Sequence, residues 1–541
     1  MRIAIAQINP TVGALAENST KILNFAEKAR ELGAGLVVFP ELALTGYPPE
    51  DLLLKPGFVK DNITALKDLA GRLKGISAVV GFVDRAGKQL FNASAFIEDG
   101  RVKYVYHKMI LPNYGVFDEI RYFKPGAAKP KIFKTGGVPA GIAVCEDIWV
   151  KDGPVKTLKS AGAKLIIAIN ASPYHISKIK EREKLIRELA AKNKTYIVYC
   201  NMVGGQDEIV FDGYSLAADP NGRIIARAPG FREDLLVFDI PAGANADKKP
   251  LKPVKAEIMP VEQEVYSALV TGLGDYVSKN GFKEAVIGLS GGIDSAIVAC
   301  LAADALGKER VHCVFMPSRF SSIDSRQDAE QTAKNLGIEL ITIPIEDIFE
   351  VYLKTLAPLF KGLNNDITEE NLQARIRGSL LMALSNKFGW LVLTTGNKSE
   401  MSTGYATLYG DMAGGFAVIK DVPKTLIYRI SEYRNTLGEA IPRRVITKAP
   451  TAELRADQKD SDSLPEYDIL DPILKSYVED DKSLAEITAK GFDRETVKKV
   501  FGLVDRSEYK RRQSPPGIKI TPRAFGRDRR MPITNKYRGN F

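Results

Sequence analysis

The chain has 541 residues, of which 45% are hydrophobic and 26% are charged, and its formal net charge is +10. Because a single hydrophobic core stops growing near ~250–300 residues, this length predicts two domains, and the ordinary globular composition argues against a disordered chain. We find no run of about 18 apolar residues and expect no secretory leader, so the sequence predicts a cytoplasmic protein without a membrane span.

Few side chains are available for a dedicated metal centre. The four cysteines lack CxxC spacing, and the three histidines form no HExxH motif. This pattern argues against a disulfide framework, a zinc ribbon and a transition-metal site. Any metal is therefore expected to be Mg²⁺, bound by carboxylates and phosphates.

Residues 1–240 alternate short β-rich runs with helical patterns, which predicts a layered α/β domain. The expected strands lie within residues 2–8, 35–41, 77–83, 94–100, 101–107, 141–147, 164–170 and 195–201. Residues 241–260 follow with four prolines, four lysines and little periodicity, as is typical of an exposed connector. We place the domain boundary in this connector.

Three of the expected strands run into a reactive side chain, namely Glu41, Lys108 and Cys145. In open α/β sheets, functional sites gather beyond the carboxyl ends of strands, so these residues can converge. A thiol that attacks an amide needs a base for its proton and a cation for the developing negative charge. Taken singly, a cysteine at a strand end is more often a small buried hydrophobe.

Other cysteine chemistry is also conceivable. Cys200 ends a strand-like run, but it has no acidic neighbour pair, and we assign it to the core. A papain-like pair with His107 or His175 is disfavoured, because His107 adjoins Lys108 and points to the opposite face of an extended strand.

The first 240 residues resemble the nitrilase (carbon-nitrogen hydrolase) superfamily in the motifs FPELALTGYPPEDLL, HKMILPNYGVFDEIRYF, CEDIW and NASPY. The resemblance implies an αββα sandwich in which Cys145 is the nucleophile, Glu41 the general base and Lys108 the oxyanion stabiliser. Glu119 matches a second glutamate near that lysine. The glutaminase subgroup further implies that Tyr114, Ser172 and Lys178 bind glutamine.

Residues 261–541 form the second predicted domain. A helix is expected over 262–280, and a second series of apolar runs then alternates with helical segments, which favours a doubly wound parallel sheet. Its expected strands lie within residues 284–290, 311–317, 339–345 and 390–396.

The first of these strands leads into a glycine-containing loop, Ser290–Ser295, and then into a helical segment. Glycines allow backbone amides to turn toward phosphate, and the helix N-terminus adds positive potential. A tight strand-to-helix turn is the plainer interpretation. The lysine of GxxxxGK[ST] is absent, so a loop for γ-phosphate transfer is not indicated.

The motif SGGIDS resembles the N-type ATP pyrophosphatases, and MPSRFSSIDSRQDAE, ENLQARIRG, LTTGNKSEMSTGYATLYGD and KAPTAELRADQKDSDS extend the resemblance to the NAD synthetase family. The resemblance implies adenylation of deamido-NAD by ATP and its amidation by ammonia from the first domain. Asp294 and Glu400 would hold Mg²⁺, while Asn371, Glu400 and Lys510 would face deamido-NAD. Asp411 and Lys459 would lie in loops that close over the site. The implied ATP-binding residues are Gly288, Leu289, Ser290, Gly291, Gly292, Ile293, Asp294, Ser295 and Thr395.

The C-terminal tail, residues 508–541, carries ten Lys or Arg against two acidic residues, a balance of +8. Composition alone allows a solvated or nucleic-acid-attracting extension as readily as a role in binding a phosphate-bearing substrate. The family resemblance favours small-molecule substrates, no nucleic acid and a homo-oligomer. A different adenylated nucleotide acceptor is the alternative, although the absence of CxxC pairs argues against tRNA thiolation.

Overall fold

The computed structural model describes residues 1–127, 129–241, 251, 254–455 and 458–537, and it divides into two compact units, Met1–Met259 and Pro260–Phe541. Most of the predicted connector lies outside the described residues. Residues 254–259 belong to the first unit, where the Arg227 guanidinium donates to the Ala256 carbonyl at 2.7 Å.

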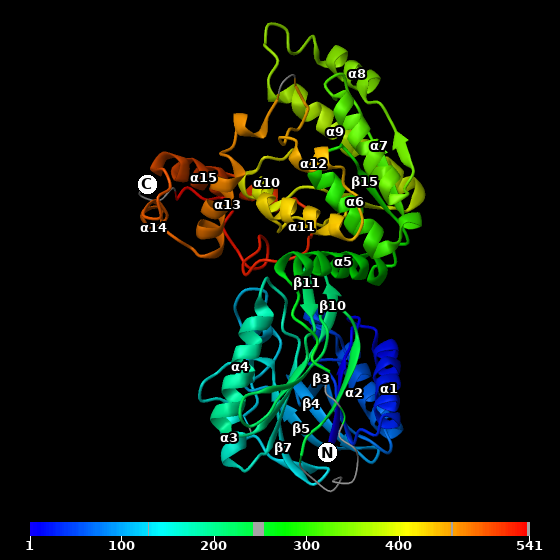
Figure 1. Cartoon of the computed structure of the whole chain (residues 1–541), viewed down its shortest axis with the longest axis vertical. Coiled ribbons are helices and arrows are strands. Elements are labelled where there is room, and N and C mark those ends of the chain that lie inside the picture. Colours follow the sequence, from blue (N-terminus) through cyan, green and yellow to red (C-terminus); the bar gives the residue numbers. More distant parts are fainter. Residues whose placement is uncertain (128, 242–250, 252–253, 456–457, 538–541) are drawn as a thin grey trace. The chain divides into compact units, whose positions relative to one another are not determined.

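The first unit contains two six-stranded sheets. Helices lie on their outer faces (Figure 1). The sheet orders are β14-β1-β2-β3-β4-β5 and β13-β12-β9-β8-β7-β6. Helices α1 (Leu15–Glu31) and α2 (Pro56–Arg72) cover the first sheet, and α3 (Pro154–Ser160) and α4 (Lys178–Asn193) cover the second. This is the αββα sandwich that the resemblance implied. The first-sheet strands are β1 (Arg2–Gln7), β2 (Leu36–Val38), β3 (Ser77–Ala86), β4 (Gln89–Glu98), β5 (Arg101–His107) and β14 (Asp234–Asp239).

The central strands of the sandwich, such as β1, are apolar on both faces, because both faces of each sheet are covered. In β1, Ile3 and Ile5 enter the core between the sheets, whereas Ala4 and Ala6 pack beneath the outer helices. Side chains alternate in direction along a strand, so a fully buried strand reads as a continuous apolar run. The second-sheet strands are β6 (Phe133–Thr135), β7 (Val138–Val144), β8 (Leu165–Asn170), β9 (Tyr196–Asn201), β12 (Leu216–Ala218) and β13 (Ile224–Arg227), and a separate hairpin joins β10 (Val203–Gln206) to β11 (Ile209–Asp212).

The second unit is built on a five-stranded parallel sheet of order β17-β16-β15-β18-β19. The chain moves outward from the central β15 in one direction and then returns to its other side, which makes the sheet doubly wound and opens a crevice beyond the end of β15. Its strands are β15 (Ala285–Gly288), β16 (Val311–Phe315), β17 (Leu340–Thr342), β18 (Leu391–Thr394) and β19 (Phe416–Ala417).

Helices cover this sheet, and α6 contacts β15 and β16 while α8 and α9 pack on the core around Val286 and Val392. The helices of this region are α5 (Val261–Lys279), α6 (Ile293–Leu306), α7 (Ile323–Leu336), α8 (Glu346–Leu356), α9 (Ile367–Phe388), α10 (Lys398–Thr403), α11 (Lys424–Thr436) and α12 (Arg443–Thr447). A separate apolar cluster holds α13 (Tyr467–Leu474), α14 (Leu484–Thr488) and α15 (Arg494–Arg506), and the short α16 (Glu508–Arg511) follows.

Residues 518–521 of the basic tail are packed into the second unit. Ile518 and Ile520 are fully buried, and the amides of Ile520 and Thr521 donate to Asp421 at 2.8 and 2.7 Å. Lys519 pairs with Asp528 inside the protein. A solvated extension is therefore the wrong interpretation for residues 518–521.

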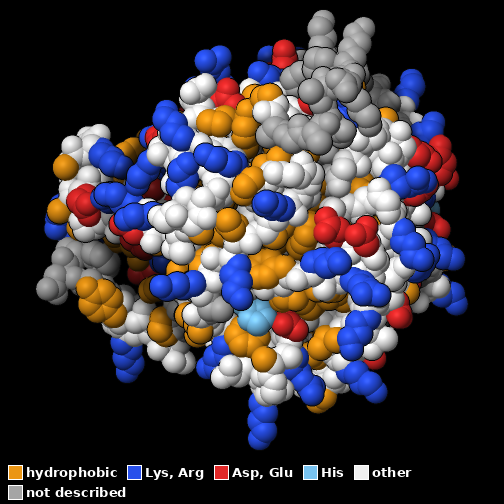
Figure 2. Space-filling model, turned by 90° about the horizontal axis from the view of Figure 1, so that it is seen from below, with side chains coloured by type: hydrophobic (Ala, Val, Ile, Leu, Met, Phe, Trp, Pro, Cys, Tyr) orange, Lys and Arg blue, Asp and Glu red, His pale blue; other side chains and the backbone are white. Residues whose placement is uncertain are grey.

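One face of the molecule is mixed in character. On the face that Figure 2 shows, Lys and Arg side chains are scattered among apolar and uncharged ones and do not form one continuous band. Among the residues that the structure describes, no helix has the length and apolar character needed to cross a bilayer.

Candidate functional site

The side chains of Glu41 and Lys108 meet in the first unit, as their positions after β2 and β5 predicted. Lys108 Nζ lies 2.8 Å from Glu41 Oε1 and 2.7 Å from Glu119 Oε1. All three side chains are almost completely excluded from solvent. Two carboxylates and one ammonium thus form a buried cluster whose charges compensate one another only in part.

Cys145 directly follows β7 and begins a short 3-10 helix, Cys145–Ile148. Its φ of 45° is an uncommon value for a residue with a side chain, and such values persist where the surroundings enforce them. Burial raises the pKa of the Cys145 thiol strongly, the charge of Glu41 adds to this effect, and Lys108 opposes it. The thiol is therefore within electrostatic range of the cluster and needs a base to become a thiolate.

Glu41 and Glu119 accept hydrogen bonds from neighbouring groups that the sequence analysis did not identify. Asn92 Nδ2 donates to Glu41 Oε1 at 2.7 Å, and the amide of Ala171 donates to Glu41 Oε2 at 2.9 Å. Tyr47 donates its hydroxyl to Glu119 Oε1 at 3.0 Å. Burial raises the pKa of Glu119 to about 7, against the opposing effect of Lys108.

Asp147 connects the strand end that carries Cys145 to the one that carries Lys108. Its Oδ2 accepts from the Val144 amide and the Tyr106 hydroxyl, both at 2.9 Å. Its Oδ1 accepts from the amides of Met109 and Ile110, at 3.1 and 2.9 Å. Burial raises the pKa of this carboxyl to about 6. One carboxylate therefore ties together the backbone on both sides of the site.

The three residues expected to bind glutamine have different surroundings. The exposed Tyr114 donates its hydroxyl to Glu146 at 3.0 Å. Buried Ser172 accepts at its Oγ from Arg182 Nε at 3.1 Å, and Arg182 itself is fully buried. Lys178 pairs with Glu181 at 2.7 Å and lies over the Trp149 ring, 4.5 Å from its centroid.

The competing thiol and the histidines lie elsewhere. Cys200 Sγ donates weakly to the Val38 carbonyl at 3.4 Å in the core between the sheets. His107 Nε2 lies 2.7 Å from Asp84 and stacks on Phe91, and His175 Nδ1 lies 3.1 Å from the Ile176 carbonyl. A papain-like pairing with Cys145 therefore receives no support.

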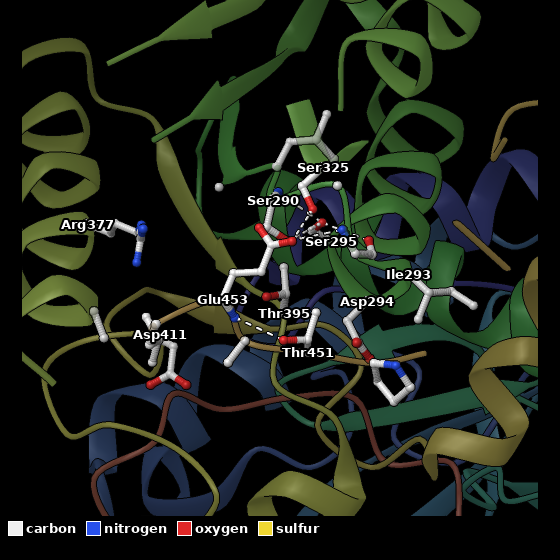
Figure 3. Close-up of a pocket in the computed structure, with 18 of the residues that line it drawn as sticks. Ser290, Ile293, Asp294, Ser295, Ser325, Arg377, Thr395, Asp411, Thr451 and Glu453 are labelled. Atoms are coloured by element: carbon white, nitrogen blue, oxygen red, sulfur yellow. Dashed lines mark hydrogen bonds between the residues drawn. The ribbon is translucent and has the colours of Figure 1, made fainter. Parts of the chain in front are cut away.

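A cavity of 300 Å³ lies at the carboxyl ends of the parallel strands in the second unit (Figure 3). The predicted loop 290–295 lines it together with Gly288 and Leu289, and residues 288–295 are named the glycine loop. Thr395, Glu400 and Asp411 also line the cavity. Ser295 Oγ accepts from the Ser290 amide at 3.1 Å and donates to the Gly292 carbonyl at 2.9 Å, which fixes the turn.

The two expected metal-binding carboxylates share a lysine that the sequence did not single out. Lys424 Nζ pairs with Asp294 and lies 3.9 Å from Glu400. Asn397 Nδ2 also donates to Asp294, at 3.0 Å. Burial raises the pKa of Glu400 strongly and the charge of Asp294 adds to this, with Lys424 opposing.

Two more basic side chains that the sequence analysis did not single out, Arg377 and Lys448, line the cavity. Arg377 Nε donates to the Met316 carbonyl at 2.9 Å, and burial lowers the pKa of this guanidinium to about 10. Lys448 Nζ donates to Ser325 Oγ at 2.6 Å. In Figure 3, Arg377 and Asp411 lie apart from the group formed by Ser290, Ser295, Ser325 and Glu453.

Three expected residues do not line this cavity. Asn371 accepts from Thr407, a lining residue, at 2.7 Å. Lys510 Nζ donates to the Gly404 and Ala406 carbonyls, both at 2.8 Å, and Lys459 is exposed. The first two therefore border the cavity through the 404–407 segment.

Comparisons with known proteins cover both units. The carbon-nitrogen hydrolase family model matches residues 2–249, and the NAD synthase family model matches residues 265–514. The glutamine-dependent NAD(+) synthetase from Thermotoga maritima is 48% identical to the chain and covers 99% of it, over 99% of its own length. The one from Aquifex aeolicus is 44% identical and also covers 99% of the chain, over 100% of its own length.

Two solved structures are similar over the same extent. The glutamine-dependent NAD+ synthetase from Acinetobacter baumannii, in complex with adenosine diphosphate, is 45% identical with a TM-score of 0.78, covering 99% of this chain and 98% of that one. The corresponding protein from Cytophaga hutchinsonii is 24% identical with a TM-score of 0.84 over the same shares, which shows likeness of fold.

Proposed function

Because the chain belongs to the glutamine-dependent NAD(+) synthetase family, we propose that its two units carry out two halves of one reaction. The protein is an ATP-dependent carbon-nitrogen ligase that uses glutamine as amido donor. In the proposal, the first unit releases ammonia from glutamine and the second adenylates and amidates deamido-NAD. The observation that carries it is the presence, in one chain, of the buried Glu41–Lys108 cluster beside Cys145 and of a cavity lined by the whole loop 288–295.

Glutamine hydrolysis begins when Cys145 Sγ attacks the side-chain amide carbon and its proton moves to Glu41. The carbon-nitrogen bond then breaks, and Glu41 returns the proton to the departing ammonia, which leaves a thioester. Water attacks this thioester while Glu41 accepts its proton, and glutamate departs as the thiol is reprotonated. The buried position of Glu41 supports this role, because no bulk water competes for the proton.

Lys108 would stabilise the oxyanion of both tetrahedral intermediates. An ammonium has three N–H donors, and Glu41 and Glu119 accept two of them. Glu119 would keep Lys108 charged and oriented. Tyr114, Ser172 and Lys178 would bind the polar ends of glutamine beside the thiol.

In the second unit, a carboxylate oxygen of deamido-NAD would attack the α-phosphorus of ATP, and the bond to the β-phosphate oxygen would break to release diphosphate. Ammonia would then attack the acyl carbon and lose a proton as AMP departs, which gives the carboxamide of NAD. The glycine loop 288–295 supports phosphate binding through its backbone amides. The relative solved with adenosine diphosphate supports an adenine nucleotide as ligand. Asn371, Glu400 and Lys510 would face deamido-NAD.

Mg²⁺ fits the donor set of Asp294 and Glu400. Both are oxygen donors in one cavity, and Mg²⁺ is usually held by one or two carboxylates together with substrate phosphates. Among the residues that the structure describes, no group of three or more His, Cys, Asp or Glu side chains could hold a metal. The ion would therefore need phosphate oxygens as further ligands, and it would neutralise phosphate charge. Lys424 would compensate the two carboxylates before the nucleotide binds.

The products test the proposed chemistry. With ATP labelled at its α-phosphorus, deamido-NAD and glutamine, we expect labelled AMP, diphosphate and NAD in equal amounts. Labelled ADP with orthophosphate would contradict cleavage at the α-phosphorus. Diphosphate release without NAD, but with another amidated nucleotide, would indicate a different acceptor. A cytoplasmic location and a homo-oligomeric state stay predictions from the sequence.

A further inference from the structure

Glu453 extends a carboxylate into the cavity beside the glycine loop. Its oxygens accept from Ser322 Oγ and Ser325 Oγ, each at 2.7 Å, and from the Ser322 amide at 3.2 Å. Figure 3 shows this side chain at the same end of the pocket as Ser290, Ser295 and Ser325. An acidic side chain therefore lies within a cavity proposed to receive polyphosphate.

The groups around this carboxylate are those that bind phosphate. Ser322 caps the N-terminus of α7, where its Oγ accepts from the Ser325 amide at 3.1 Å. Lys448 Nζ lies 2.6 Å from Ser325 Oγ and 3.6 Å from Glu453 Oε1. Hydroxyls, a backbone amide at a helix N-terminus and an ammonium together form an anion site that Glu453 occupies.

This anion site adjoins the glycine loop. A Cβ atom on Gly291 would lie only 2.2 Å from the Ser325 carbonyl oxygen, so the loop backbone packs directly against the start of α7. The φ of 84° at Gly291 likewise favours glycine. Ser325, Lys448, Glu453 and loop 288–295 all line the one cavity. An anion bound to the glycine loop would therefore lie next to the Glu453 carboxylate.

We propose that Ser322, Ser325 and Lys448 form a subsite for the diphosphate portion of ATP, and that Glu453 is a built-in substitute for this ligand. The inference rests on the proposed function, which requires diphosphate to leave from this cavity. In the absence of nucleotide, the Glu453 carboxylate satisfies the donors of the subsite. Incoming phosphate displaces it, and its return after the reaction competes with diphosphate and favours product release.

Titration calorimetry of the full-length protein with inorganic diphosphate and Mg²⁺ tests the subsite. Removing the competing charge in Glu453→Gln is expected to lower the Kd for diphosphate about three- to tenfold, because a neutral amide is held less strongly by these donors than a carboxylate and is displaced more easily. Lys448→Met is expected to raise the same Kd, because it removes the cation. Glu439→Gln, at an exposed position outside the lining, is the matched control and is expected to bind like wild type.

AMP, which lacks the β- and γ-phosphates, makes the test specific. Its Kd is expected to be equal in wild type and Glu453→Gln. Unchanged or weaker diphosphate binding by Glu453→Gln, or unchanged binding by Lys448→Met, would overturn the inference. Diphosphate release by wild type during NAD synthesis is measured in parallel: its absence would overturn the proposed function, whereas its presence with unaltered variant affinities would overturn this inference alone.

Discussion

The charged side chains of the two sites are paired in different ways. In the first unit, Glu41 and Glu119 each accept a hydrogen bond from Lys108, and all three side chains are buried. In the second, Lys424 pairs with Asp294 and Glu453 with serine hydroxyls, inside a cavity large enough for a ligand. The comparison indicates that the proposed glutaminase site is assembled before a substrate binds. The proposed nucleotide site instead holds its charges in internal contacts that a ligand would replace.

Removing the nucleophile should separate the two sites most clearly. Cys145→Ala is expected to reduce NAD formation from glutamine at least about a thousandfold, because no thioester can form, and to leave synthesis from ammonium salts largely intact. Cys200→Ala is the control. Loss of glutamine hydrolysis in Cys200→Ala, or its survival in Cys145→Ala, would show that the nucleophile is wrongly assigned. Both rates are read from NAD and glutamate formation.

Asp294→Ala should have the opposite effect, so that the second site loses activity while the first site keeps it. We expect diphosphate release to fall about a hundredfold or more with either nitrogen source, since the expected Mg²⁺ ligand and the Lys424 partner are lost together. Basal glutamine hydrolysis should remain. Diphosphate assays with glutamine and with ammonium measure the effect, and wild-type release with both would refute a role for Asp294.

Asp147 tests whether the first site depends on fixed geometry. Its carboxylate form, which accepts four hydrogen bonds, is lost as the pH falls through its raised pKa of about 6. Protonation of Asp147 should therefore steepen the decline in glutamine hydrolysis below about pH 6, beneath the range in which Glu119 takes up its proton. Asp147→Asn should lower kcat/KM about tenfold at neutral pH, because an amide cannot accept four such bonds, and should alter this acid limb.

Two further variants serve as controls for the effect of Asp147→Asn on glutamine hydrolysis. Tyr106→Phe removes one of the four donors and should have a smaller effect, whereas Asp152→Asn alters only an exposed ion pair with Lys156. The pH profile of glutamine hydrolysis decides the matter. Identical acid limbs in wild type and Asp147→Asn would contradict the positioning role.

A change confined to one substrate is expected at Lys510, at the border of the second cavity. Lys510→Ala should raise the KM for deamido-NAD about tenfold, since a cation beside the 404–407 segment is lost, and should change the KM for ATP less. Glutamine hydrolysis should not change. If both KM values stay at their wild-type levels, Lys510 serves only to hold the Gly404 and Ala406 carbonyls.

Sequence reasoning recovered the parts of the molecule with a strong local pattern. Apolar runs such as 164–170 contain fully buried strands, and residues 290–295, predicted as a phosphate-binding turn, do line a cavity. The strands β10 to β14 were not identified, because most are only three or four residues long. Short strands acquire their burial from distant partners, as β14 does by pairing with β1.

The supporting residues were harder to find. Lys424 is one of 76 Lys and Arg residues, and nothing in its local sequence indicates that it meets Asp294 across 130 positions. Asn92 and Asp147 likewise act through contacts that only the folded sheets create. In the tail, composition left a solvated extension and a substrate-binding role equally open, and the burial of Ile518 and Ile520 could not be read from it.

The central claim is that nitrogen released at the first site enters the product made at the second. It is tested most directly by mass spectrometry of NAD formed from ATP, deamido-NAD and glutamine labelled with ¹⁵N in its side-chain amide. We predict NAD one mass unit heavier, with the label in its carboxamide group, and no labelled NAD from Cys145→Ala. Unlabelled NAD, or no NAD from the wild-type protein, would contradict the account.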